Sequence, residues 1–163
     1  MLIALKNKGF LTIDDFIFKC AIGKNGIKLK KKEGDQTTPS GKFSIGKLYY
    51  RADRVKKPLV KISTKIITKN MGWCDDPKSK YYNKEIKINK NISHEKLFKK
   101  EDIYDYFIVI NYNTTKIVPY KGSAIFIHLT KNYNTTAGCI ALIRKDFLIL
   151  LKLIDRKTKI KIT

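Results

Sequence analysis

The stretch that decides the fold is Gly122-Ser-Ala-Ile-Phe-Ile-His-Leu-Thr-Lys-Asn-Tyr-Asn-Thr-Thr-Ala-Gly-Cys-Ile-Ala-Leu142. Two apolar runs, 124–129 and 139–143, flank a polar segment, a pattern that predicts strand, surface loop and strand. His128 lies at the end of the first run and Cys139 opens the second. Because such a loop can bring an imidazole and a thiol together, the stretch predicts a cysteine nucleophile with a histidine base.

This chemistry has definite requirements. A thiol with a pKa near 8.5 is mostly protonated at neutral pH, and a neighbouring imidazole can take its proton and stabilise the thiolate. Gly138 lacks a Cβ, so the backbone can turn sharply before Cys139. The amides of Gly138 and Cys139 are predicted to face a developing oxyanion, at about 3 kcal/mol per donor. Thr136 is predicted to orient the imidazole or to bind substrate.

A plainer interpretation fits the same residues. A lone cysteine is usually an inert apolar side chain, and a lone histidine at a strand end is usually a satisfied polar group. The other histidine, His94, falls in the first turn of a helix predicted over Ser93–Lys100 and is expected to be exposed. It is the weaker candidate for a base.

The motif residues carry a resemblance. Gly122–His128, followed by Thr136-Ala-Gly-Cys139-Ile-Ala-Leu142, resembles the signature of the L,D-transpeptidase catalytic domain family (YkuD-like), in which a His precedes a Ser/Thr-x-Gly-Cys element. Further segments are similar to its small stand-alone branch, in the expected order: Glu33–Phe43, Tyr50–Arg54, Gly72–Pro77 and Tyr104–Tyr106. Two positions depart from many family members: Ala137 replaces a second His before Gly-Cys, and Ala141 replaces an Asn or Arg after it.

The resemblance implies a mainly β fold, a curved sheet or sandwich with one or two short helices. It also implies acyl transfer on peptidoglycan stem peptides without a cofactor or a metal. The Cys139 thiolate would attack the carbonyl of the diamino acid before a terminal D-alanine, with His128 as base and then acid. An amine acceptor would give a cross-link and water a trimmed stem, as in an L,D-carboxypeptidase-type hydrolase. A non-catalytic cell-wall-binding module is the other alternative.

Two segments are candidates for substrate binding. Trp73 stands beside Asp75 and Asp76 in a basic chain, so a cationic ligand group would find a ring face and carboxylates there. These aspartates can equally cap their own loop. Arg51 and Arg54 can bind carboxylates in a two-point fashion, although an isolated Arg is more often solvated or paired with a local Asp.

Composition predicts one globular domain over residues 1–163, because 43% of the residues are hydrophobic and the length suits a single core. The formal charge of +21 favours polyanionic partners, among them nucleic acid, lipid headgroups and anionic wall polymers. Compositional bias toward Lys, Ile and Asn explains the charge equally well. The lysines are dispersed and no nucleic-acid motif is present, so no specific nucleic-acid partner is expected.

The three cysteines include no CxxC pair, which argues against a zinc site or a disulfide framework. Cys20 is predicted to lie in the core and Cys74 to line the site, with a disulfide between them left open. The first residues lack the features of a secretory signal, and no run is long enough for a membrane span. The expectation is a soluble chain that is either in the cell envelope, as its function would require, or cytoplasmic.

The remaining elements follow from local patterns. Short β runs separated by turn residues predict strands, and the alternating Lys159–Ile162 predicts an edge strand protected by its lysines. Apolar residues at helical spacing predict an amphipathic helix over Arg144–Ile154. The predicted strands are Leu2–Leu5, Phe16–Ile22, Ile27–Leu29, Phe43–Ile45 and Phe107–Ile110.

Overall fold

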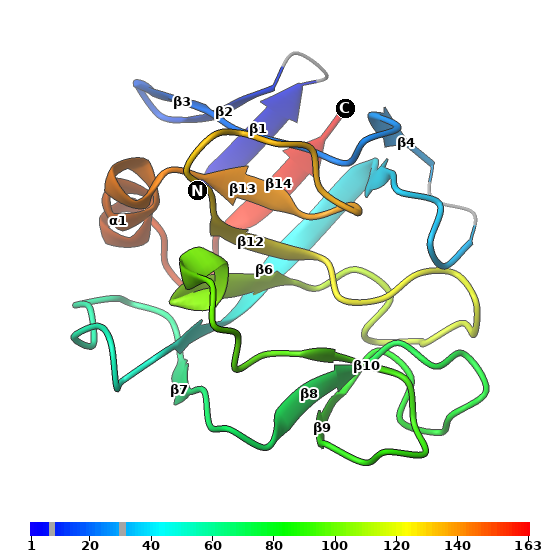
Figure 1. The fold of residues 1–163 in the computed structure, drawn as a ribbon. Helices are drawn as coiled ribbons and strands as arrows, with labels where there is room; N and C mark the ends of the chain where they lie inside the picture. Colours follow the sequence, from blue (N-terminus) through cyan, green and yellow to red (C-terminus); the bar gives the residue numbers. More distant parts are fainter. Residues whose placement is uncertain (7–8, 30–31) are drawn as a thin grey trace.

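The computed structural model describes residues 1–6, 9–29 and 32–163, and the protein is mainly β (Figure 1). Most of the chain alternates strands with turns. The described strands are β1 (Leu2–Lys6), β2 (Phe10–Ile13), β3 (Phe16–Lys19), β4 (Ile27–Lys28), β5 (Thr38–Pro39), β6 (Gly41–Tyr50), β7 (Thr64–Ile66), β8 (Met71–Cys74), β9 (Glu85–Lys87), β10 (His94–Lys96), β11 (Tyr106–Ile110), β12 (Phe126–Leu129), β13 (Ile140–Leu142) and β14 (Lys159–Ile162). The 3-10 helix η1 (Asp102–Tyr104) and the helix α1 (Arg144–Leu153) complete the described elements.

The largest sheet runs in the order β13-β12-β11-β6-β14-β1-β2-β3, with β7 also paired to β6. It curls until the segment after β3 meets β13. There Ala21 and Ala141 exchange backbone hydrogen bonds of 2.8 and 2.9 Å. The sheet is therefore nearly closed, and the closure lies beside the strand that follows Cys139.

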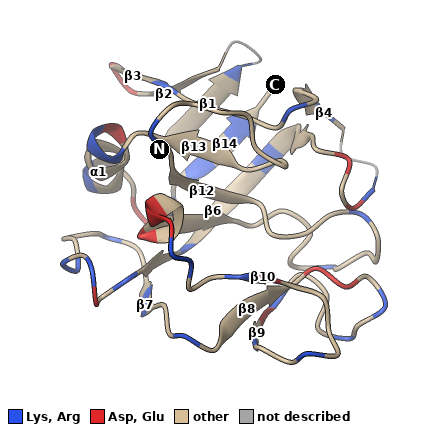
Figure 2. Cartoon of the chain, in the orientation of Figure 1, with Lys and Arg blue, Asp and Glu red and all other residues tan. Residues whose placement is uncertain are grey.

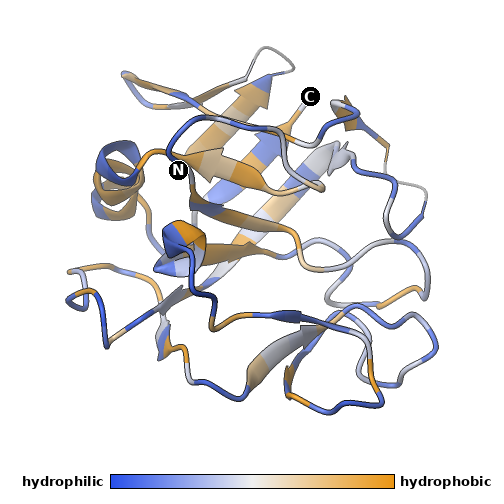
Figure 3. Cartoon of the chain, in the orientation of Figure 1, coloured by the Kyte–Doolittle hydropathy of each residue, from blue (hydrophilic) through white to orange (hydrophobic). Residues whose placement is uncertain are grey.

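The main core fills the inside of this curled sheet. Alternate side chains of β1, β2 and β14 point inward, which is the period-two pattern of a strand with one buried face. The helix α1 covers one side and buries Phe147, Leu150 and Leu151. Figure 3 shows the hydrophobic colouring that runs along β12 and β13, both of which are fully buried.

A second, aromatic cluster joins the large sheet to a smaller one of order β10-β8-β9. Phe107 of β11 stacks on Tyr49 at 4.7 Å and lies 4.6 Å from Phe126, measured between ring centroids. Trp73 of β8 meets Phe126 edge-on at 5.2 Å. The small sheet is thereby fixed against β12, the strand that carries His128.

Several predicted elements are confirmed. The strands around Cys139 and His128, the buried strand β11 and the helix α1 all lie where the hydrophobic periodicity placed them. The strand predicted over Phe16–Ile22 ends earlier, at Lys19. The strand β2 was not anticipated.

Two predictions are wrong. The helix expected over Ser93–Lys100 is instead the strand β10, because His94, Glu95 and Lys96 pair with β8, and this sheet pairing overrides local helix preference. The edge strand expected at Lys159–Ile162 lies inside the sheet, between β6 and β1. Its lysines therefore do not protect an edge.

Candidate active site

Cys139 stands one residue before β13 and is partly buried. Its thiol donates to the carbonyl oxygen of Ala124 at 3.2 Å, and the amide of Phe126 points at the sulfur from 3.3 Å. The amide of Phe126 would stabilise a thiolate, whereas the carbonyl of Ala124 accepts the proton of the thiol. The sulfur thus lies against the backbone at the start of β12.

The turn before Cys139 is held by Thr136. The Thr136 hydroxyl donates to the Cys139 carbonyl oxygen at 2.6 Å and accepts from the Gly138 amide at 3.1 Å. Gly138 has φ +141°, and a Cβ there would lie 2.8 Å from the Thr37 carbonyl oxygen. Only glycine suits this position. Thr136 stabilises the turn through its own neighbours, and the Gly138 amide proposed for an oxyanion is directed at the Thr136 hydroxyl.

The sheet closure fixes this turn from the other side. The Lys24 amide donates to the Thr136 carbonyl oxygen at 2.9 Å, and the Thr136 amide donates to the Ile22 carbonyl oxygen at 3.0 Å. The Gly23 amide in turn donates to the Thr38 hydroxyl at 2.8 Å. The loop over 33–41 is therefore packed against the Cys139 turn.

His128 lies on β12, directly opposite Ala141 of β13. Residues two apart on a strand face the same side, so His128 and Cys139 share one face of the sheet. The Nδ1 atom is 2.8 Å from the Leu129 carbonyl oxygen. This contact assigns the proton to Nδ1 and leaves Nε2 as the basic nitrogen. Burial holds the pKa of His128 below its usual 6.5, which favours the neutral form that a general base requires.

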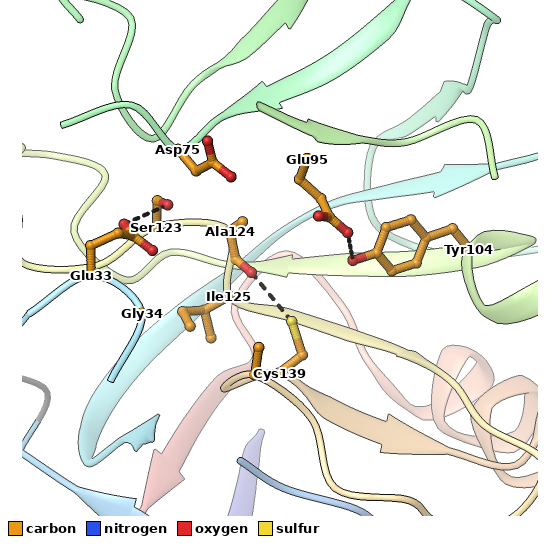
Figure 4. Close-up of a pocket in the computed structure, with 10 residues that line it drawn as sticks. Glu33, Gly34, Asp75, Glu95, Tyr104, Ser123, Ala124, Ile125 and Cys139 are labelled. Atoms are coloured by element: carbon orange, nitrogen blue, oxygen red, sulfur yellow. Dashed lines mark hydrogen bonds between the residues drawn. The ribbon is translucent and has the colours of Figure 1, made fainter. Parts of the chain in front are cut away.

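A cavity of about 160 Å³ opens beside the Cys139 sulfur (Figure 4). Its wall brings together residues from six separate segments of the chain. They are Glu33, Gly34, Asp75, Glu95, Tyr104, Ser123, Ala124, Ile125, Ala137 and Cys139. Figure 4 shows the sulfur directed toward a space surrounded by three carboxylates.

These carboxylates are held mainly by hydroxyl groups. Glu33 accepts from Tyr82 and, at 2.8 Å, from Ser123. Asp75 accepts from the Ser93 hydroxyl at 2.6 Å. Within the described ranges, neither Glu33 nor Asp75 forms an ion pair with a lysine or arginine. In a chain of net charge +21, this leaves a region of uncompensated negative charge beside the thiol.

The third carboxylate belongs to a network around His128. Glu95 accepts from the Tyr104 hydroxyl at 2.9 Å and pairs with Lys99 at 3.0 Å. The Tyr104 ring meets the imidazole of His128 edge-on at 5.5 Å. Burial, the nearby Cys139 and Glu95 raise the pKa of Tyr104 well above its usual value, so its hydroxyl stays a hydrogen-bond donor. Tyr104 therefore contacts both the cavity and the imidazole of His128.

Trp73 supports the cavity wall from below. It is buried, and its indole N–H donates to Asn83 Oδ1 at 2.9 Å. The same oxygen accepts the Ala124 amide at 3.1 Å, and Ala124 has the left-handed φ of +52°. Asn83 thus holds the strained residue whose carbonyl contacts the Cys139 thiol. Trp73 positions the wall and does not itself line the cavity.

The other predicted binding residues lie outside the cavity wall. Asp76 accepts the Lys78 amide at 3.0 Å, which caps its own turn. The buried Arg51 forks onto Asp53 at 2.8 and 2.7 Å. Arg54 binds Asp105 at 3.2 Å. Both arginines also bond carbonyl oxygens in the 99–101 segment, so they hold the chain that leads to Tyr104.

Comparison with known proteins gives the family. The model of the L,D-transpeptidase catalytic domain matches residues 3–162. The chain belongs to this family. The helical cell shape determining protein Pgp2 from Campylobacter jejuni is similar over 99% of this chain, with a TM-score of 0.52 and 16% identity. An L,D-transpeptidase from Mycobacterium smegmatis gives a TM-score of 0.47 and 11% identity over 99% of this chain.

The chain spans 46% of the Pgp2 chain and 58% of the mycobacterial one, so it is similar to part of each. The likeness to Pgp2 shows a shared fold. A search of curated proteins found no match. The predicted family and the predicted mainly β fold class are confirmed, whereas the roles of individual site residues stay predictions.

The remaining thiols and the second histidine do not line this cavity. Cys20 and Cys74 are both free and buried, so the structure contains no disulfide between them. Burial raises the pKa of the Cys20 thiol to about 12. His94 is half-buried on β10, opposite Cys74, and its Nδ1 atom lies 2.7 Å from the Ile92 carbonyl oxygen.

Sequence reasoning missed three groups of the cavity. Glu33, Glu95 and Ser123 were not singled out, although Glu33 opens one of the family-like segments. The two glutamates could have been noticed by their negative charge, because each acid stands out in a lysine-rich chain. Among the described residues no cluster of His, Cys, Asp and Glu is suited to a metal, and no helix is long and apolar enough to cross a membrane.

Proposed function

We propose that the chain is a cysteine-dependent acyltransferase that acts on peptidoglycan stem peptides. The observation that carries the proposal is the placement of a partly buried thiol, on one sheet face with a neutral imidazole, beside an acidic cavity in an L,D-transpeptidase fold. The donor is a stem peptide with a diamino acid before a terminal D-alanine.

Acylation begins when His128 Nε2 takes the proton of the Cys139 thiol. The thiolate attacks the carbonyl carbon of the diamino acid, a C–S bond forms and the carbonyl electrons move onto oxygen. The amide of Phe126, 3.3 Å from the sulfur, favours the thiolate. Collapse of the tetrahedral intermediate expels D-alanine, whose amine takes the proton from His128 and leaves a thioester on Cys139.

Deacylation uses the same groups in reverse. His128, now neutral again, takes a proton from the acceptor as the acceptor attacks the thioester carbon. The thiolate of Cys139 leaves and the new amide or carboxylate is released. An amine acceptor forms a cross-link, and water gives the trimmed stem of an L,D-carboxypeptidase-type reaction.

The carboxylates of the cavity supply the selectivity for this donor. The side-chain ammonium of the diamino acid is a cation, and Asp75 and Glu33 present carboxylates without a cation of their own among the described residues. A charge-assisted hydrogen bond of this kind contributes about 1.5 to 3 kcal/mol. Trp73, whose ring the sequence predicted to face a cationic ligand group, supports this wall from behind.

Intact-protein mass spectrometry with a disaccharide-tetrapeptide tests the proposal. Wild type is expected to form an adduct and release D-alanine, and Cys139→Ala is expected to lose both by more than about 10⁴-fold. The final product separates cross-linking from hydrolysis. A folded wild-type protein that neither forms an adduct nor releases D-alanine would contradict the proposal and favour the non-catalytic wall-binding module.

The same function places the protein in the cell envelope, where anionic wall polymers would also meet its positive charge. Fractionation of cells with an antibody to the folded domain tests this. Recovery in the cytoplasmic fraction alone would contradict an envelope location without touching the chemistry of Cys139.

A further inference from the structure

The positive charge of the chain has a structured component on the outward side of the large sheet. Pairing across five strands aligns exposed side chains in rows. One row contains Lys42 of β6, Lys161 of β14, Ala4 of β1, Thr12 of β2 and Ile17 of β3. A second row contains Ser44, Lys159 and Leu2, and a third contains Lys6, Phe10 and Lys19. We call these three rows the outer sheet face.

Carboxylates are absent from the three rows, all of whose members belong to the described part of the chain. Figure 2 shows the Lys and Arg colouring on β14 and at the tip of β1. Lys161 and Lys42 are directly opposed, and like charges in that position destabilise a sheet. A negative ligand would relieve this repulsion.

Edge protection does not explain the lysines of β6, β14 and β1. Lysines on edge strands prevent further strand pairing, but β6, β14 and β1 are interior strands whose two neighbours are already paired. The acidic cavity beside Cys139 does not use them either, since none of them lines it.

Large apolar side chains are exposed among the lysines of the outer sheet face. Leu2 is 43% exposed, Phe10 is 47% exposed and Ile17 is 70% exposed. A hydrated polyanionic polymer would gain little from these side chains. Lysines that surround exposed aliphatic and aromatic groups suit a surface with phosphate groups above an apolar layer.

We propose that the outer sheet face docks the protein on a membrane surface that contains anionic phospholipids. The lysines would contact the headgroups, while Leu2, Phe10 and Ile17 would enter the boundary between headgroups and acyl chains. This docking does not depend on the chemistry of Cys139. It would hold the acidic cavity near the membrane while leaving it free for substrate.

Cosedimentation with lipid vesicles tests the proposal. Wild type is expected to bind vesicles with one third phosphatidylglycerol at about 0.15 M salt. It is expected not to bind vesicles of pure phosphatidylcholine. The triple variant Lys42→Gln, Lys159→Gln, Lys161→Gln should weaken this binding about a hundredfold. The matched control Lys78→Gln, Lys87→Gln, Lys90→Gln changes three exposed lysines of the β8–β9 region. This control variant has the same net charge as the first triple variant and should change vesicle binding less than about threefold.

The apolar part of the proposal has its own variant. Phe10→Ser with Ile17→Ser should retain the salt-sensitive part of the binding and lose the part that persists in about 0.5 M salt. Thermal unfolding followed by circular dichroism verifies that each variant is folded. Equal weakening by both lysine triples would assign the effect to total charge and overturn the proposal.

Two further outcomes would also overturn it. One is the absence of binding to phosphatidylglycerol vesicles by folded wild type. The other is binding of soluble polyphosphate through the same three lysines without any binding to vesicles, which would assign the face to a polymer. Repeating the measurement with Cys139→Ala separates docking from catalysis, because this variant should bind vesicles as wild type does.

Discussion

The cavity beside Cys139 and the outer sheet face carry opposite charge in one small chain. The cavity presents Glu33, Asp75 and Glu95, and only Glu95 has a lysine partner among the described residues. The outer sheet face presents lysines of β6, β14 and β1 without an acid in its rows. A net charge of +21 therefore describes neither region.

The difference lies in how each region holds its charge. Hydroxyl groups of Tyr82, Ser93 and Ser123 fix the cavity carboxylates in place, which suits recognition of one cation at a defined position. The lysines of the outer sheet face are long, exposed and spread over several strands, which suits a diffuse surface of negative charge. The first arrangement provides specificity and the second provides attraction.

After the loss of Cys139 itself, the largest decrease in the rate of acylation is expected from His128→Gln. Without the basic nitrogen, adduct formation should fall about 10²- to 10⁴-fold. His94→Gln is the matched control, because it changes the other histidine of the chain and should leave the rate within about threefold. Rates of D-alanine release measure both. Equal losses in the two variants would contradict the role of His128.

The pH dependence of the same reaction follows from burial. His128 must be neutral to act as a base, and burial lowers its pKa below 6.5, so protonation is delayed to more acid pH. The acid limb of D-alanine release is therefore expected below pH 6.5. A limb centred above this value would show that another group controls the rate.

Recognition of the ammonium gives a smaller effect. Asp75→Asn removes one carboxylate that faces the cavity and should raise KM for a tetrapeptide about 10- to 100-fold with little change in kcat. Asp76→Asn is its matched control, because Asp76 caps a turn outside the cavity. A donor whose side-chain amine is acetylated should show no difference between Asp75→Asn and wild type. A clear difference with that donor would argue against ammonium binding.

Local patterns predicted the part of the site that is built from neighbouring strands. The alternation of apolar residues placed β12 and β13 correctly, and Gly138 signalled the turn before Cys139. These features depend on side-chain period and on backbone freedom, which a sequence displays directly. The helix α1 was predicted for the same reason.

The cavity wall and the outer sheet face depend on pairing between distant segments. Glu33, Asp75 and Glu95 meet only because β10 pairs with β8 and the 33–41 loop packs on the Cys139 turn. Because Ser93–Lys100 was predicted to be a helix, Glu95 was not recognised as a residue of the cavity. The lysines of β14 were likewise predicted to protect a sheet edge. In the structure β14 instead pairs in parallel with β1, which joins the two ends of the chain. The pairing of strands that lie far apart in the sequence leaves no pattern in either segment alone.

The smallest expected effect comes from Glu95, the cavity carboxylate that already has a cation. The negative charge of Glu95 raises the pKa of His128, and the positive charge of Lys99 lowers it. Glu95→Gln removes the first influence and leaves Lys99 unpaired, so both changes lower the pKa of His128. The base then stays neutral to lower pH, and the acid limb of Cys139 alkylation should move in that direction.

Iodoacetamide alkylation measures this shift without any substrate, and the buried Cys20 and Cys74 should stay unmodified in the folded protein. The rate at neutral pH should change less than about fivefold, because a half-exposed ion pair contributes at most about 1 kcal/mol. Tyr104→Phe is the matched control: it removes the hydroxyl that donates to Glu95 but keeps the charge and the ring against His128. A shift in Glu95→Gln that Tyr104→Phe does not share would show that the charge of the cavity tunes the base. Identical shifts would assign the effect to the hydrogen bond instead.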